Sequence, residues 1–289
     1  MRNLCLTLLT LALVAGCGLA PAAPPQSFSG EQARKLVAEQ VDFGPRPPDS
    51  PALSRTRAWI ESALEAAGWD SRRQSFEYQG VELVNVIGSG GASGPLIVLG
   101  AHYDTRPMAD QDPDNPKDPV MGAIDGASGV AVLLELARVV PRLSLTCRVE
   151  LAFFDGEDSG GLNGWEWIVG STHYAASLGE DPDAVVIVDM VGDRSLRLPR
   201  ELNSDSELQA EIWGVAGELG YQESFVDQGG YSMMDDHTPF LRRGWPAVDI
   251  IDFDYPAWHT TNDVLDQVSA DNLQIVGRTL QEWLQRRCG

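Results

Sequence analysis

Residues 96–104 read Leu96-Ile97-Val98-Leu99-Gly100-Ala101-His102-Tyr103-Asp104. The run from Leu96 to Gly100 is apolar without interruption, which is typical of a β-strand that is buried on both faces. Such a strand needs helices on both sides of its sheet. The stretch therefore predicts an interior strand of an α/β fold, with His102 and Asp104 directly after its carboxyl end.

Strand-like and helix-like segments alternate along the rest of the chain. We expect further strands at residues 81–87, 148–154, 185–190 and 247–251. We expect helices at residues 31–41, from Ser50 or Ser54 to residue 67, and at 130–140, 165–178, 208–219 and 272–287. Gly88-Ser89-Gly90-Gly91 is interpreted as a hairpin turn between two strands. This order predicts a three-layer α/β/α sandwich with a mixed, mostly parallel central sheet.

The composition is that of an acidic globular protein. Hydrophobic residues make up 43% of the 289 residues, which is enough for a sizeable core and excludes a disordered chain. The chain has 42 Asp and Glu against 21 Lys and Arg, a net charge of −21. Because a chain this acidic repels a phosphate backbone, we expect no nucleic acid among its partners. We expect a single folded domain over residues 30–289.

The amino-terminal residues have the pattern of an export signal. Arg2 precedes a short apolar run at residues 4–14, which is too short to span a bilayer. Val14-Ala15-Gly16-Cys17 then resembles the lipobox of bacterial lipoproteins, although an ordinary cleavage site with a chance cysteine is the alternative. The resemblance implies a signal peptide at residues 1–16 and a lipidated Cys17. It also implies an Ala- and Pro-rich tether at 17–29 and a cell-envelope lipoprotein held to the membrane only by its lipid.

Cys147 and Cys288 are the cysteines left in the expected domain. An exported compartment permits a disulfide between them, and two free buried thiols are equally compatible with the sequence. The sequence contains no C-x-x-C motif. We therefore do not expect a metal site built from cysteines.

Every expected buried strand from residue 96 onward is followed by groups that can bind metal. These groups are His102, Asp104, Asp125, Asp155, Glu157, Asp158, Asp189, Asp252, Asp254 and His259. Ligands of α/β sheets bind outside the carboxyl ends of the strands, so we expect these side chains to converge. Histidine and carboxylate ligands suit a catalytic zinc, and also manganese, cobalt or iron. Without a cation, clustered carboxylates would raise one another's pKa.

Several motifs, in this order, resemble the zinc exopeptidases of the M28 clan. They are His102-Tyr103-Asp104, Gly122-Ala123-Ile124-Asp125-Gly126-Ala127-Ser128-Gly129, Phe153-Phe154-Asp155-Gly156-Glu157-Asp158, Gly170-Ser171 and Trp258-His259-Thr260. Residues 235–246 and 249–256 resemble more closely the glutaminyl-peptide cyclotransferases, a branch of that clan, and residues 102–116 resemble its bacterial members. The resemblance covers roughly residues 40–287. It implies that residues 30–289 are one catalytic domain of this kind.

The resemblance also implies roles for individual residues. Asp125, Asp158 and His259 would hold one Zn²⁺, and Glu157 would be the general acid and base. A hydrogen-bond network beside Glu157 would include Asp189, Asp235 and Asp249, and the substrate pocket would be walled by Trp258, Trp165, Trp167 and Tyr255. Many family members have Glu-Glu where this chain has Glu157-Asp158, so Glu157 could be the ligand instead. Asp249 stands where animal cyclases have histidine, and His237 is expected to be a supporting residue.

The implied reaction is the cyclisation of the N-terminal glutamine of peptides to pyroglutamate, with release of ammonia. The main alternative is a two-zinc M28 aminopeptidase that hydrolyses N-terminal residues. In that enzyme His102 and Asp189 would be additional ligands and Asp125 would bridge the two ions. A non-catalytic lipoprotein that binds metal or peptide is a third possibility, and it predicts loss of the base, whereas Glu157 is present.

Overall fold

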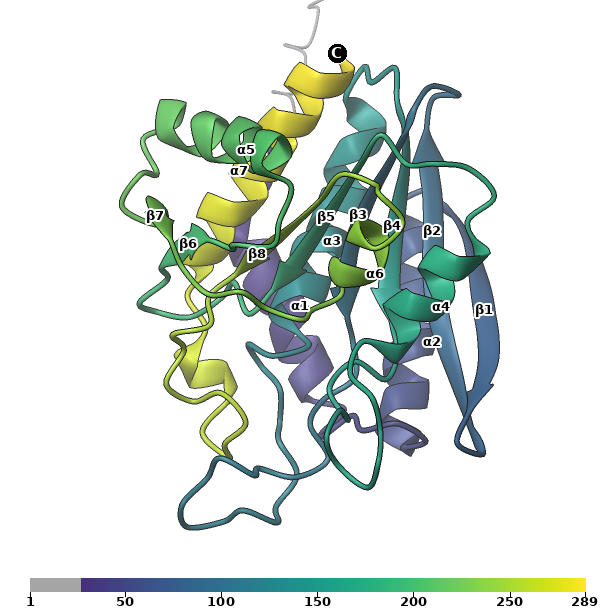
Figure 1. Ribbon diagram of the computed structural model, residues 1–289, viewed down its shortest axis with the longest axis vertical. Coiled ribbons are helices and arrows are strands. Elements are labelled where there is room, and N and C mark those ends of the chain that lie inside the picture. The colour runs from purple at the N-terminus through teal and green to yellow at the C-terminus, as the bar shows by residue number, and fades with distance from the viewer. Residues whose placement is uncertain (1–26) are drawn as a thin grey trace, which may run out of the picture.

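The computed structural model describes residues 27–289 and has a six-stranded sheet at its centre (Figure 1). The strand order of this sheet is β1-β2-β4-β3-β5-β8. The bounds of these strands are Asp70–Tyr78 (β1), Val81–Gly91 (β2), Leu96–His102 (β3), Arg148–Phe154 (β4), Ala184–Asp189 (β5) and Ala247–Ile251 (β8). β4, β3, β5 and β8 are parallel to one another, whereas β2 pairs antiparallel with both β4 and the edge strand β1. The prediction of a mixed, mostly parallel sheet is therefore confirmed.

Helices cover both faces of this sheet. One face packs against α1 (Gly30–Val41), α2 (Pro51–Ala66), α3 (Ser128–Val139) and α7 (Ala270–Cys288). The other face packs against α4 (Val169–Ser177) and the short α6 (Thr238–Leu241), where Tyr174 and Phe240 complete a second apolar core. The helix α5 (Ser206–Glu218) lies beside α7 and β8. The strands β6 (Leu198–Arg200) and β7 (Phe225–Gly229) form a separate small sheet. The three-layer prediction is confirmed.

Side-chain caps fix the starts of the long helices. Ser29 accepts a hydrogen bond from the Gln32 N–H at the start of α1, and Ser269 does the same for Asn272 at the start of α7. Of the two expected starts of the second helix, Ser50 is the one used, because its hydroxyl accepts the Leu53 N–H and Pro51 follows it. Two 3₁₀ turns, Val140–Arg142 and Leu265–Gln267, complete the helical segments of the described chain.

Two local predictions are wrong. The helix expected at residues 165–178 begins only at Val169, because Gly164 and Ile168 have positive φ and residues 165–168 form a loop. Residues 88–91 are not a turn but the end of β2. A Cβ on Gly88 or Gly90 would lie 2.8 Å from Leu64 or Trp69, so glycine is needed there to let the overlying side chains approach the strand.

The start of the folded domain also differs slightly from the prediction. The expected signal peptide and most of the expected tether, residues 1–26, lie outside the described residues. Phe28 and Ser29, which the predicted tether includes, belong to the domain instead: Phe28 is buried against Gly277, and Ser29 caps α1. Within residues 27–289, no helix combines the length and the apolar character that crossing a membrane requires.

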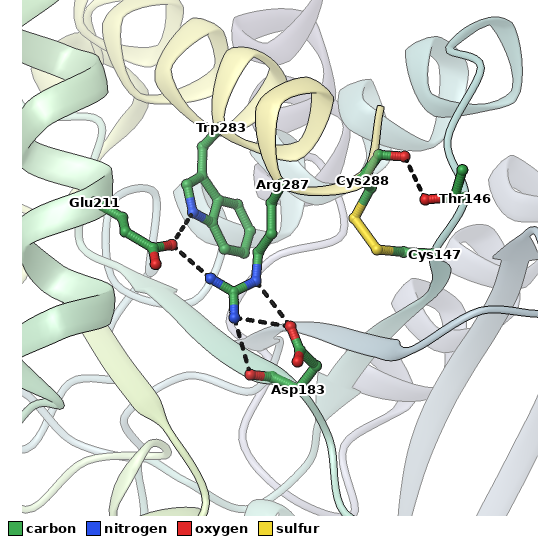
Figure 2. Close-up of a disulfide and its surroundings, with 7 residues drawn as sticks. All are labelled: Thr146, Cys147, Asp183, Glu211, Trp283, Arg287 and Cys288. Atoms are coloured by element: carbon green, nitrogen blue, oxygen red, sulfur yellow. Dashed lines mark hydrogen bonds and ion pairs between the residues drawn. A yellow bond between two sulfur atoms is a disulfide. The ribbon is translucent and has the colours of Figure 1, made fainter.

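A disulfide joins Cys147 and Cys288, so the alternative of two free thiols is not realised (Figure 2). Their Cα atoms are 5.3 Å apart, and the bond ties the end of α7 to the residue that precedes β4. The Thr146 hydroxyl donates to the Cys288 carbonyl at 2.8 Å. The preceding residue, Arg287, pairs with Asp183 and with Glu211 (Figure 2).

Candidate functional site

The carboxyl ends of the parallel strands meet at one end of the sheet, from which the long loops after β3 and β4 extend (Figure 1). The chain leaves β3 for β4 on one side and later reaches β5 on its other side. This reversal of strand order opens a crevice at the carboxyl ends of β3 and β5. A cavity of about 250 Å³ lies there. Its lining residues are Asp125, Glu157, Asp158, Trp167, Asp189, Met190, Met233, Met234, Asp235, Ile251, Phe253, Trp258 and His259.

Asp125, Asp158 and His259 come together as the sequence predicts. One ligand atom from each lies within 4.8 Å of the others, and all three residues are buried. The His259 Nε2 is 3.0 Å from the Asp158 Oδ1 and 3.7 Å from the Asp125 Oδ2. The other oxygen of Asp158 is buried without a hydrogen bond among the described residues. Two carboxylates and one imidazole with an unpaired buried oxygen are a donor set that fits a divalent cation such as zinc.

A second cluster shares Asp125 with the first. It contains His102, Asp125 and Asp189, again with one ligand atom from each within 4.8 Å. The His102 Nε2 lies 3.1 Å from both carboxylates. The structure thus brings together both ligand sets that the sequence suggests, with Asp125 between them.

Two buried aspartates outside both ligand clusters hold the backbone of these ligands; Asp104 was expected among the metal-binding groups, and Asp263 was not predicted. Asp104 accepts the N–H groups of Glu157 and Asp158, each at 3.1 Å. Asp263 accepts the N–H groups of Ile124 at 2.8 Å and of Asp125 at 3.1 Å. A carboxylate that spans two successive N–H groups fixes a loop. Sequence reasoning could find Asp104 by its position after a strand, but Asp263 has no such signal.

The pKa values of the carboxyl groups in the site are raised, as expected for clustered buried acids, with Asp125 as the exception. Burial and the charge of Asp125 raise the pKa of Asp158 to about 6, although His259 opposes the shift. Burial also raises the pKa of Asp189. Asp125 differs: burial would raise its pKa, but the hydrogen bond and charge of His102 lower it. Burial raises the pKa of Glu157 well above its usual value, and Asp235 adds to this although His102 opposes it. This shift favours the protonated form of Glu157.

A second group of buried acids continues from Asp235 into the protein interior. Burial and the charge of Asp189 raise the pKa of Asp235 to about 7. Asp236 is also buried next to it, and neither of its carboxylate oxygens has a partner within residues 27–289. Asp236 was not predicted, because two adjacent aspartates cannot be distinguished by spacing alone.

Asp249 lies deeper and does not form the hydrogen bonds that were predicted for it. Its Oδ2 is 3.8 Å from the His237 Nδ1, and neither oxygen has a hydrogen bond in the described chain. On its other side, the His237 Nε2 is 3.2 Å from Glu201. His237 is buried and belongs to neither ligand cluster.

Two of the four predicted aromatic residues wall the cavity. Trp258 and Trp167 line it, and their rings stack on the His259 imidazole at centroid distances of 3.8 and 6.1 Å. Trp165 does not line it, because its ring packs against Tyr78 on β1. Tyr255 does not either: it is buried, and its hydroxyl donates to Asp263 at 3.1 Å.

Five apolar lining residues were missed from the sequence. Met190, Met233, Met234, Ile251 and Phe253 all line the cavity. Phe253 packs edge-on against Trp258 at a centroid distance of 5.0 Å. Methionines in a loop carry no periodic signal, so only the tertiary structure reveals their place.

Comparison with known proteins agrees with this geometry. A glutaminyl-peptide cyclotransferase-like protein of Bos taurus is 26% identical over 84% of this chain and 72% of its own length. The glutaminyl cyclase of Bacteroides thetaiotaomicron, solved with N-acetylhistamine, is similar with a TM-score of 0.85 and 32% identity, over 90% of this chain and 98% of that chain. A Zn-dependent exopeptidase of Parabacteroides distasonis is similar with a TM-score of 0.86 and 29% identity, over 91% and 100%.

The profile of peptidase family M28 matches residues 85–284. This match contains both ligand clusters, Glu157 and the residues that line the cavity. The predicted resemblance to M28-clan, glutaminyl cyclase-like proteins is thereby confirmed. The chain belongs to peptidase family M28.

Proposed function

We propose that this protein is a zinc-dependent glutaminyl-peptide cyclotransferase, which converts the N-terminal glutamine of peptides to pyroglutamate and releases ammonia. The observation that carries the proposal is the position of Glu157, buried in an aromatic-walled cavity together with Asp158 and His259. The similarity to glutaminyl cyclases supports the same reaction.

Asp125, Asp158 and His259 would hold one zinc ion. Their ligand atoms lie within 4.8 Å of one another, and a buried oxygen of Asp158 is left free to bind. This set leaves one coordination position open for substrate, as catalytic zinc sites do. When bound, zinc polarises the side-chain carbonyl of the substrate glutamine as a Lewis acid.

Glu157 is the proton carrier in this proposal. The neutral α-amine attacks the side-chain amide carbon, a new C–N bond closes the five-membered ring, and the bond to the amide nitrogen breaks. Glu157 takes the proton that the attacking nitrogen loses and gives it to the leaving nitrogen, which departs as ammonia. Its burial in the cavity, which raises its pKa, suits a group that both takes up and releases a proton.

Asp189 and Asp235 would support this proton transfer. Both line the cavity, and burial raises the pKa of each. Carboxyl groups that share protons can keep Glu157 in the protonation state that each step needs. Asp249 does not line the cavity, and burial and the charge of Asp235 raise its pKa, so it has no direct part in this transfer.

The aromatic walls would orient the substrate. Trp167, Trp258 and Phe253 surround a small space that suits the compact side chain of an N-terminal glutamine. Enclosing the substrate excludes water, which would otherwise compete with the amine for the same carbon. Holding the amine close to that carbon also supplies an orientation advantage.

A two-zinc aminopeptidase is the second candidate, and the His102–Asp125–Asp189 cluster favours it. In that enzyme Asp125 would bridge the ions, and Glu157 would activate water. The similarity to a Zn-dependent exopeptidase is consistent with it, but the similarity to cyclases favours the first candidate.

Zinc counting and product analysis on the same purified protein distinguish the two. The cyclase predicts one zinc per chain and ammonia release from peptides that begin with Gln. The aminopeptidase predicts two zincs per chain and free amino acids from the same peptides. A protein that yields neither product contradicts both proposals.

We also propose that the protein is exported and anchored in the cell envelope by a lipid on Cys17, in line with the lipobox-like sequence Val14-Ala15-Gly16-Cys17. Expression in a bacterium that processes lipoproteins tests this. The full chain should partition into detergent and carry a lipid-modified amino-terminal cysteine by mass spectrometry. A Cys17→Ser variant should not.

A further inference from the structure

The backbone of His259 is strained. Its φ is +53°, in the left-handed region that residues with a side chain rarely adopt. Such a conformation persists only where the surroundings hold it. His259 follows Trp258 in a loop after β8, so the segment needs contacts from elsewhere in the chain.

The loop at residues 106–115 supplies those contacts. The Gln111 N–H donates to the His259 carbonyl at 3.2 Å. One oxygen of Asp112 accepts the Thr261 N–H at 3.0 Å and also the Thr261 hydroxyl. The other oxygen accepts the N–H groups of Asp114 and Asn115, each at 2.9 Å. Asp112 is 5% exposed, so it links its own loop firmly to the main chain two residues after His259.

The same loop faces the side chain of His259. The Nε2 atom points to Asp158 at 3.0 Å. The Nδ1 atom is buried without a hydrogen bond among the described residues, and an oxygen of Asp110 lies 3.4 Å from it. Asp110 is held by two hydrogen bonds from Arg106, at 3.0 and 2.9 Å. Arg106 is 3% exposed and also donates to the carbonyls of Asp158 and Gly160 at 3.1 and 2.8 Å. Asp110 is therefore fixed relative to the loop that carries Asp158.

We propose that Asp110 and Asp112 are positioning residues that hold His259 in the geometry needed to bind zinc. Asp112 fixes the left-handed main chain, and the Asp110 carboxylate, 3.4 Å from Nδ1, favours the tautomer that carries its proton on Nδ1 and leaves Nε2 for the metal. A carboxylate on the remote nitrogen of a histidine ligand fixes its tautomer and ring orientation. This inference rests on the proposed zinc role of His259.

Single charge-neutral substitutions in the same loop test the proposal. Asp110→Asn and Asp112→Asn are compared with Asp114→Asn, which removes the same charge from an exposed position. Zinc affinity is measured on the full protein by competition with a chromophoric chelator. We expect affinity to fall about 10–100-fold for the first two variants, the range known for partners of metal-bound histidines. Asp114→Asn should stay within about twofold, because surface charges contribute little.

Two further variants separate positioning from general stability. Asp110→Glu keeps a carboxylate and should recover part of the lost affinity, and Thr261→Val removes only the hydroxyl contact of Asp112 and should weaken zinc binding less than Asp112→Asn. Thermal unfolding of the metal-free proteins is measured in parallel. A merely structural role would lower the unfolding temperature and leave the zinc affinity of the folded protein unchanged.

The outcomes for this inference are distinct from those for the reaction. Zinc affinities of Asp110→Asn and Asp112→Asn equal to that of Asp114→Asn overturn it, and so does a wild-type protein that binds no zinc. A wild-type protein that binds zinc but forms no pyroglutamate contradicts the proposed function and leaves the affinity comparison fully informative.

Discussion

The two ends of β4 are built in opposite ways. At its amino end, Cys147 is bonded to Cys288, and Arg287 pairs with acids from two other elements (Figure 2). At its carboxyl end, Asp158 and nearby buried acids have oxygens without partners in the described residues. Unpaired buried charge costs stability, whereas cross-links and satisfied ion pairs supply it. One end therefore stabilises the fold, and the other holds the groups that a cation and a substrate can engage.

Removing a metal ligand from the site at the carboxyl end of β4 should have the largest effect, and that effect is on zinc binding. His259→Ala deletes the only imidazole of the Asp125–Asp158–His259 cluster. We expect zinc affinity to fall by more than about 100-fold, because losing even a partner of a ligand costs 10–100-fold. Zinc content of the purified variant and cyclisation of a Gln-peptide check this. Zinc content equal to wild type would remove His259 from the site.

Replacing the proton carrier should separate chemistry from metal binding. Glu157→Gln keeps the size and the fold but cannot accept a proton. We expect zinc content to be unchanged and turnover to fall about 10²–10⁴-fold, the usual contribution of a general acid and base. Steady-state kinetics with a Gln-peptide and metal analysis measure the two quantities. Turnover within tenfold of wild type would exclude Glu157 from this role.

Removing the disulfide at the amino end of β4 should lower the stability of the fold without changing the site at the carboxyl end. The Cys147→Ser/Cys288→Ser double variant is expected to lose about 2–5 kcal/mol of unfolding free energy, because the bond closes a long loop. Below its unfolding temperature, its kcat/KM should match wild type. Thr146→Val is the matched control, since it removes one hydrogen bond to the Cys288 carbonyl and should cost only about 0.5–1.5 kcal/mol. A loss of kcat/KM in the folded double variant would show that the two ends are coupled.

The parallel core and its ligands were predictable because both depend on local pattern. Buried strands such as β3 and β5 are continuous apolar runs, and the ends of parallel strands necessarily meet. Asp125, Asp158 and His259 could therefore be counted among ten candidate ligands before their geometry was known, and the resemblance singled them out. The resemblance to a known family supplied their roles, which spacing alone does not.

The remaining parts depend on contacts between distant segments. Gly88 and Gly90 look like turn residues, but Leu64 and Trp69 require glycine at both positions within a strand. Trp165 and Tyr255 look like pocket residues, but each has a partner elsewhere, Tyr78 and Asp263. The short β6 and β7 have too few residues for a periodic pattern.

The smallest expected change is in how the unfolding free energy depends on pH. It involves Asp155, at the carboxyl end of β4. Burial and the charge of Asp104 raise the pKa of Asp155 from 3.8 to about 7, although Arg57 and the Val84 N–H oppose the shift. Between pH 3.8 and about 7, Asp155 binds a proton more often in the folded chain than in the unfolded chain. The unfolding free energy of the chain must therefore fall as pH rises through this window, by up to about 1.4 kcal/mol per pH unit.

Asp155→Asn tests this, because asparagine does not titrate. Losing the 3.1 Å contact with Arg57 should lower stability equally at pH 5.5 and 6.5, so the slope between them isolates the proton. Urea unfolding at both pH values should give a more positive slope for Asp155→Asn than for wild type, whereas Thr146→Val at the opposite end should leave the slope unchanged. Equal slopes for Asp155→Asn and wild type would mean that Asp155 is ionised throughout, because Arg57 and the backbone N–H then outweigh its burial.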